Sequence, residues 1–221
     1  MKKILGIDTG GTYTDSVVLE AGTKNLLYKS KTLTTKHNLR HCIETCFEQI
    51  PSEFLQDISM VCLSTTLATN AIVENHGCRE GLILIGKKPK GMMPTDRYAI
   101  VEGLYDIMGR MRRPLNKEEI IRTIEKFRDK VDAIAISGYA SIRNPAHEVY
   151  VAEMVRERLN IPVVCAHELT STLGYYERTV TADLNARLIP LVCALMDAVR
   201  HVMERLSIDA PLMIVKGDGS L

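Results

Sequence analysis

The chain has 221 residues, of which 46% are hydrophobic and 25% charged, and its formal net charge is +1. This is ordinary globular usage for a chain that can bury a core without disulfides. The near-neutral charge argues against an electrostatic nucleic-acid footprint and against a polybasic membrane patch. The amino terminus has neither a signal-peptide core nor an apolar run that could span a bilayer, so we expect a cytoplasmic protein without a membrane partner.

Apolar alternation predicts three strands before the first helix. They are expected at residues 3–8, 13–20 and 26–33, followed by a helix at 36–50 and a strand at 58–64. Three hairpin-linked strands in succession exclude a simple alternation of strands and helices.

Beyond residue 64 the pattern does alternate. We predict helices at 66–76, 116–129, 145–159 and 175–206, and strands at 81–86, 131–137, 161–165 and 212–216. Antiparallel strands followed by parallel ones indicate an α/β fold. We expect a mixed sheet that is antiparallel in its first three strands and parallel in the remainder, with helices on both faces.

Residues 87–115 interrupt this alternation with prolines and glycines among three arginines, Arg110, Arg112 and Arg113. Connections of this length are uncommon unless they are functional or disordered. We interpret the segment as an insert or long excursion. Whether it is functional or disordered stays open.

The turn that begins at Asp8, Asp-Thr-Gly-Gly-Thr-Tyr-Thr-Asp, can hold a phosphate. Gly10 and Gly11 lack the Cβ atoms that keep an anion at a distance, so successive backbone N–H groups can converge on it. Thr12 and Thr14 add hydroxyl donors, and the Asp8 carboxylate suits a hydrated Mg²⁺. A Walker loop and a dinucleotide fingerprint are excluded, because the residues that follow continue as a strand. An ordinary tight hairpin is the alternative.

Hydroxyl groups also gather where the strand at 58–64 meets the next helix. Thr65 and Thr66 would surround the first N–H groups of that helix, an end that attracts anions. Simple capping by Thr65 explains the same residues and, taken without context, is the favoured explanation.

The apolar stripe of the long helix becomes polar toward its amino-terminal end, where it meets Asn185, Thr181 and Arg178. With Glu177 next to Arg178, this end is expected to leave the core and line a cleft. Arg178 could there bind a phosphate or carboxylate through two hydrogen bonds. A structural pair of Arg178 and Glu177 is the alternative.

The chain carries five motifs in order, DTGGTYTD, STTLATNAIVENHG, SIRNPAHE, YERTVTADLNARLIPL and APLMIVKGDGSL. Together they resemble the amino-terminal region of the hydantoinase/oxoprolinase family. The resemblance implies the ribonuclease-H-like fold of actin-like ATPases, in which two lobes hold ATP and Mg²⁺ between them. It also implies that residues 1–221 form the amino-terminal lobe, with an insert at about 87–115, and that a second lobe or a further subunit lies outside this chain.

The resemblance also assigns residues to the cleft. The implied cofactor-binding residues are Asp8, which also holds the metal, Gly10, Gly11, Thr12, Tyr13, Thr14 and Asp15. The implied substrate-side residues are Thr65, Thr66, Asn70, Glu177 and Asn185. The implied catalytic residues are Asp8, Thr12 and Arg178.

Members of this family use ATP to phosphorylate the oxygen of a lactam, cyclic imide or ketone before hydrolysis or carboxylation. The resemblance therefore implies the substrate-side lobe of an ATP-dependent hydrolase of cyclic amides such as hydantoin or 5-oxoproline, in an enzyme that can form homo-oligomers. We expect little turnover from this piece alone. The alternatives are a component of an ATP-dependent ketone carboxylase, a non-catalytic nucleotide-binding switch, and a sugar or carboxylate kinase.

The chain departs from the family pattern in three places. Leu63-Ser64 stands where the family has His-Gly, and Gly217-Asp218-Gly219-Ser220 replaces the usual glycine pair near the end. Residues 87–115 do not follow the pattern either. The substrate therefore stays open.

Overall fold

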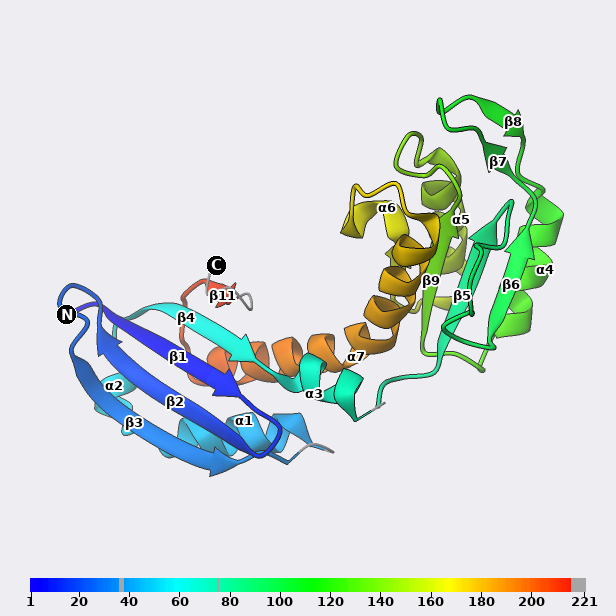
Figure 1. Cartoon of the computed structure of the whole chain (residues 1–221). Coiled ribbons are helices and arrows are strands. Elements are labelled where there is room, and N and C mark those ends of the chain that lie inside the picture. The colour runs from blue at the N-terminus through cyan, green and yellow to red at the C-terminus, as the bar shows by residue number, and fades with distance from the viewer. Residues whose placement is uncertain (36–37, 75, 216–221) are drawn as a thin grey trace. The chain divides into compact units, whose positions relative to one another are not determined.

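A computed structural model describes residues 1–35, 38–74 and 76–215. The chain divides into two compact units (Figure 1), the first made of residues 1–75 and 191–221 and the second of residues 76–190. Each unit has hydrophobic cores of its own. The motif at 217–220 and the predicted end of the last strand at residue 216 lie outside the described residues.

The first unit is built on a five-stranded sheet in the order β11-β4-β1-β2-β3. Its antiparallel strands are β1 (Lys3–Thr9), β2 (Tyr13–Glu20) and β3 (Leu26–Leu33). Its parallel strands are β4 (Ile58–Thr65), beside β1, and β11 (Leu212–Ile214), beside β4. The predicted order, antiparallel strands first and parallel strands after, is confirmed for this part of the chain. Burial alternates along β1 and β2 as apolar and polar residues alternate in their sequences.

Helices pack on this sheet through a single core. α1 (Leu39–Glu48) contributes Phe47 to this core, and the end of α7 (Tyr175–Arg205) contributes Val199. The short helices α2 (Ser52–Leu55) and α3 (Leu67–Val73) pack against the same core. In the part of the chain that the structure describes, these helices gather on one face of the sheet (Figure 1). The prediction of helices on both faces is therefore wrong for this sheet.

The second unit has a separate parallel sheet in the order β10-β9-β5-β6. Its strands are β5 (Glu80–Ile85), β6 (Tyr98–Val101), β9 (Ala133–Gly138) and β10 (Val163–Cys165). The expectation of one continuous sheet is thus wrong. Every residue of β5 and of β9 is buried, which requires a sheet covered on both faces.

Helices cover both faces of this second sheet, as predicted. α4 (Lys117–Phe127) and α5 (Ala146–Leu159) share a core with one face, and the first half of α7 (Tyr175–Arg205) shares a core with the other. The short helix α6 (Ala166–Leu169) follows β10.

Residues 87–115 are more regular than predicted. They contain β6, which joins the sheet, and a two-stranded hairpin of β7 (Leu104–Tyr105) and β8 (Met111–Arg113). All three residues of β8 are exposed, so no apolar alternation marks it in the sequence.

The long helix α7 passes from the second unit into the first, and Pro190 lies in its interior at the boundary. Because proline lacks an N–H group, the Ala186 carbonyl loses its helical donor and accepts the Cys78 thiol at 3.4 Å. By length and composition α7 could cross a membrane, which is weak evidence alone. Its apolar residues, among them Ala182 and Val199, serve the cores of the two units.

Candidate functional site

The turn between β1 and β2 presents the backbone N–H groups of Gly11 and Thr12 side by side. The Gly10 N–H donates to the Tyr13 carbonyl at 2.9 Å and closes the turn, and the Thr34 N–H donates to the Thr12 carbonyl at 2.8 Å. Among the hydrogen bonds between described residues, none uses the N–H of Gly11 or of Thr12. Adjacent free peptide N–H groups at such a bend can bind an anion.

The first position of this turn leaves little room for a side chain. A Cβ on Gly10 would lie 3.0 Å from the Tyr13 carbonyl oxygen and 3.8 Å from Thr66 Oγ1. A side chain at this position would therefore require the Tyr13 carbonyl to shift by a few tenths of an ångström. The same distances place Thr66, at the start of α3, beside the hairpin.

The end of β4 is fastened to the turn. The Thr65 hydroxyl donates to the Thr9 carbonyl at 2.8 Å and accepts the Leu67 N–H at 3.0 Å, while the Thr66 N–H donates to the same Thr9 carbonyl at 3.2 Å. Asn70 Nδ2 lies 3.4 Å from Thr66 Oγ1. Thr65, Thr66 and Asn70 thus lie together near the turn. The Thr65 hydroxyl binds the first N–H group of α3, but the N-cap residue of this helix is Thr66, so the alternative of simple capping by Thr65 is wrong in its position.

Two carboxylates stand opposite each other on the sheet face that the described helices leave uncovered. Asp8 pairs with Asp15 in the ladder between β1 and β2; Asp8 is exposed and Asp15 is half-buried. Asp15 forms an ion pair with Lys31 Nζ at 3.2 Å, and that Nζ lies 4.9 Å from the centroid of the Tyr13 ring. No ion pair between described residues involves Asp8, so its carboxylate is open to a divalent cation.

Thr14 faces the opposite side of the sheet. It is fully buried, and its hydroxyl lies 3.0 Å from Thr34 Oγ1 and 3.2 Å from Cys42 Sγ. The structure corrects the direction expected for this hydroxyl, because successive residues of a strand point to opposite faces and Thr14 pairs with buried Thr9 rather than with Asp8. Thr12, in contrast, is exposed at the turn.

Arg178 belongs to the second unit and is fully buried. Its guanidinium donates to the carbonyls of Thr172 at 2.8 Å, Tyr139 at 2.9 Å and Gly138 at 3.3 Å. This corrects both the open cleft and the pair with Glu177 that we expected for it, because these donors hold loop carbonyls. Burial lowers the pKa of Arg178.

Glu177 and Asn185 are exposed on α7 in the second unit. Asn185 Nδ2 donates to the Thr181 carbonyl one turn back at 2.8 Å. The turn at Gly10 lies in the first unit. That Glu177 and Asn185 belong to one site with this turn therefore stays a prediction.

A polar cluster that was not predicted from the sequence lies at the carboxyl ends of β9 and β10. Glu148 is fully buried and accepts the Gly138 N–H at 2.6 Å and the His167 N–H at 3.0 Å. His167 Nδ1 lies 2.6 Å from the same carboxylate, and this hydrogen bond raises the pKa of His167. The signal available in the sequence was an acid in the first turn of a helix that follows an apolar strand.

Cys165 brings a third group of metal-ligand type within 4.8 Å of Glu148 and His167. Burial, together with the charge of Glu148, raises the pKa of the Cys165 thiol to about 12. Since the thiol stays protonated and the carboxylate is already bonded to three N–H groups, we interpret the cluster as a hydrogen-bonded network.

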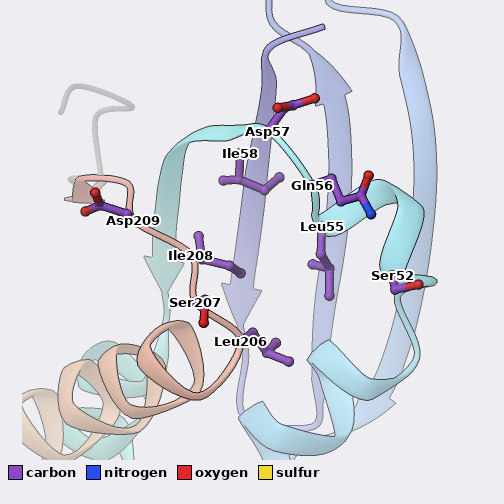
Figure 2. A pocket seen from close by; sticks show the side chains of 9 residues that line it. All are labelled: Ser52, Leu55, Gln56, Asp57, Ile58, Leu206, Ser207, Ile208 and Asp209. Atoms are coloured by element: carbon purple, nitrogen blue, oxygen red, sulfur yellow. The ribbon is translucent and has the colours of Figure 1, made fainter.

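A groove of about 510 Å³ lies at the other end of the first sheet (Figure 2). Aliphatic side chains, including Leu55 and Ile208, lie toward its middle, and Asp57 and Asp209 lie at its rim. β4 runs from Ile58 in this groove to the residue beside the turn, and eight strand residues span roughly 23 Å. The groove is therefore separate from the turn.

Comparisons with known proteins agree with the motifs. Residues 4–159 match the family described as hydantoinase/oxoprolinase, N-terminal region. The chain is 29% identical to the caprolactamase subunit alpha of Pseudomonas jessenii, over 98% of this chain and 36% of the relative. It is 31% identical to the acetophenone carboxylase gamma subunit of Aromatoleum aromaticum, over 83% of this chain and 31% of the relative.

Solved structures give the same result. The crystal structure of the ATP-dependent caprolactamase of Pseudomonas jessenii aligns with a TM-score of 0.74 and 28% identity, over 96% of this chain and 35% of that one. Nucleotide-free acetone carboxylase aligns with a TM-score of 0.76 over 96% and 36% of the chains, and at 18% identity it shows the fold alone. The chain spans about a third of the length of these relatives.

Proposed function

The chain belongs to the hydantoinase/oxoprolinase family, and from this premise we propose that it is the phosphate-binding part of an ATP-dependent enzyme that opens cyclic amides. The observation that carries the proposal is the turn between β1 and β2, where two N–H groups have no hydrogen-bond partner among the described residues and an exposed carboxylate lies beside them. The similarity to a caprolactamase that is ATP-dependent supports both the nucleotide and the substrate class.

The residues at the turn suit a magnesium nucleotide. The N–H groups of Gly11 and Thr12 would donate to phosphate oxygens, with the exposed Thr12 hydroxyl as a third donor. Asp8 would hold Mg²⁺ through its water shell, which neutralises phosphate charge. ATP would supply a phosphoryl group to the amide oxygen, which makes the carbonyl carbon more electrophilic. Such transfer depends on positioning and charge neutralisation, which these groups can provide.

Other predicted residues take supporting roles in this proposal. Gly10 keeps the turn closed, and Thr65 ties β4 to it. Tyr13 and Asp15 share Lys31, which links the start of β2 to the end of β3. Arg178 acts as a positioning residue through the carbonyls of the loop after β9.

Thr66, Asn70, Glu177 and Asn185 remain candidates for the substrate side. The substrate would be a small molecule, and a second lobe or a further subunit would complete the enzyme, in keeping with relatives about three times as long. We further propose a cytoplasmic location, where ATP is available.

A ketone carboxylase component is the second candidate. The 31% identity to an acetophenone carboxylase subunit favours it. The two candidates share the phosphate turn and differ in the acceptor, so the turn itself does not separate them.

Calorimetry with magnesium triphosphate tests the phosphate site, because this probe needs no contact to a base or ribose. The chain should bind it with a Mg²⁺-dependent affinity, and Asp8→Asn should remove that dependence. Asp209→Asn, an exposed aspartate in the separate groove, is the matched control and should bind as the native chain does. Affinity that is independent of both Mg²⁺ and Asp8 would refute the proposal.

A further inference from the structure

The second unit contains a topological switch point. Its spatial strand order is β6-β5-β9-β10, so the chain moves from β5 to β6 on one side and continues with β9 on the other. In open parallel sheets, ligands bind outside the carboxyl ends of the strands where the order reverses in this way. A ligand is therefore expected at the edge of the sheet beyond Ile85 and Gly138, where β5 and β9 end.

A small cavity that is partly open to solvent lies at that edge. Its walls come from the segments that follow β5, β6 and β9 and from the start of α5, and they include Gly103, Tyr105, Ser141, His147 and Glu148. Its volume is about 10 Å³, which admits a single water-sized group. The cavity can therefore take one end of a ligand, while the rest would lie toward the β7–β8 hairpin that supplies Tyr105.

His147 offers an unused hydrogen-bonding atom in this cavity. The residue is 8% exposed, and within the described ranges its Nδ1 is buried without a hydrogen-bond partner. Its ring packs on Tyr105 with centroids 4.2 Å apart, and a Cβ on Gly103 would come within 3.2 Å of Nδ1. Buried polar atoms nearly always pair with protein groups or water, so His147 Nδ1 at this switch point is an acceptor that a ligand can use.

The surroundings select an uncharged partner. Burial lowers the pKa of His147, so its ring is neutral near pH 7. The fully buried Glu148 carboxylate disfavours an anion, and the positive end of α5, which begins at Ala146, disfavours a cation. Apolar walls from Ile85 and Leu104 disfavour either charge.

We propose that this cavity binds the N–H end of a small neutral amide, with the N–H donating to His147 Nδ1 and the ring of Tyr105 packing beside it. The inference rests on the proposed function for the choice of a cyclic amide among neutral ligands. It deepens that function by giving the second unit a recognition site for the substrate class.

The test uses the full chain with ¹⁵N-labelled histidine and follows the ring nitrogens by NMR. Titration with δ-valerolactam should shift His147 Nδ1 in a saturable way. N-methyl-δ-valerolactam, which lacks the donor, should bind about tenfold more weakly, the effect of one lost hydrogen bond at a buried acceptor. Equal affinity for both lactams, absence of binding, or a shift that spares His147 would overturn the inference.

A variant supplies an independent check. His147→Phe keeps an aromatic ring against Tyr105 without the nitrogen and should lose at least tenfold in lactam affinity, while His41→Gln, an exposed residue on α1, should lose none. If His147→Phe does not fold, the two lactams on the native chain decide. Magnesium triphosphate binding is measured in parallel: triphosphate binding without lactam binding overturns this inference alone, and lactam binding without triphosphate binding overturns the phosphate site alone.

Discussion

Replacing Asp183 with asparagine should stabilise the protein above neutral pH. Asp183 lies on α7 within the second unit and is only 2% exposed, and among the described residues its Oδ1 has no hydrogen-bond partner. Burial, followed by the charge of Glu80, raises the pKa of Asp183 to about 7, while Arg187 and Arg97 act in the opposite direction. The sequence pattern of α7 gives no sign of such a group.

The sign follows from proton linkage. The folded-state pKa lies above the unfolded value of 3.8, so the native state binds the proton more tightly. The resulting contribution to stability is fully present below about pH 4 and is lost as the pH rises through about 7. The difference between the two values corresponds to about 4 kcal/mol at about 1.4 kcal/mol for each pKa unit, an upper bound for the gain from Asp183→Asn.

Urea unfolding at pH 5 and at pH 8.5, followed by circular dichroism, measures the effect. Asp183→Asn should raise the free energy of unfolding by up to about 2 kcal/mol at pH 5, where the carboxyl of the unfolded chain is already ionised, and by up to about 4 kcal/mol at pH 8.5. Asp197→Asn, an exposed position on the same helix, is the control and should have no such pH dependence. An equal effect of Asp183→Asn at both pH values would refute the reasoning.

Two further predictions concern buried hydrogen bonds. Thr14→Val should cost about 1 kcal/mol of stability, because the Thr14 hydroxyl bonds to Thr34 and Cys42. The affinity for magnesium triphosphate should not change. Weaker binding in calorimetry would show that this hydroxyl belongs to the phosphate site after all. Glu148→Gln should lower the pKa of His167 toward its ordinary value of 6.5. It should thereby remove a stabilising contribution that is full below about pH 6.5 and is lost as the pH rises through the folded-state pKa. Histidine NMR between pH 5 and 9 measures this pKa, and an unchanged midpoint in the variant contradicts the assignment.

Local pattern was enough for the longer helices and strands, but not for β6, β7 and β8 within residues 87–115. β1 and β2 alternate apolar and polar residues because one face of their sheet is buried, and the helix at 117–127 begins at Asn116, whose side chain accepts two N–H groups. The division into two sheets was out of reach, because a fully buried strand such as β5 has the same apolar sequence in either sheet. Which sheet it joins is decided by the tertiary packing of α4, α5 and α7.

The candidate site was predictable where it depends on local sequence and not where it depends on tertiary packing. The glycines of the turn indicate a close backbone approach, and the structure bears out the tight contact at Gly10. The burial of Arg178 was hidden, because its acceptors are backbone carbonyls near 139 and 172 that carry no sequence signature. The pair of Glu148 and His167 depends on the adjacency of β9 and β10, which brings together residues 19 positions apart.

The position of a bound phosphate tests the central claim most directly. Mn²⁺ in place of Mg²⁺, added with triphosphate to the ¹⁵N-labelled chain, broadens the amide resonances of residues near the metal. The account predicts the strongest broadening at Gly11 and Thr12, and its loss in Asp8→Asn. Broadening that centres on the groove at Asp57 and Asp209, or that persists in the variant, would contradict it.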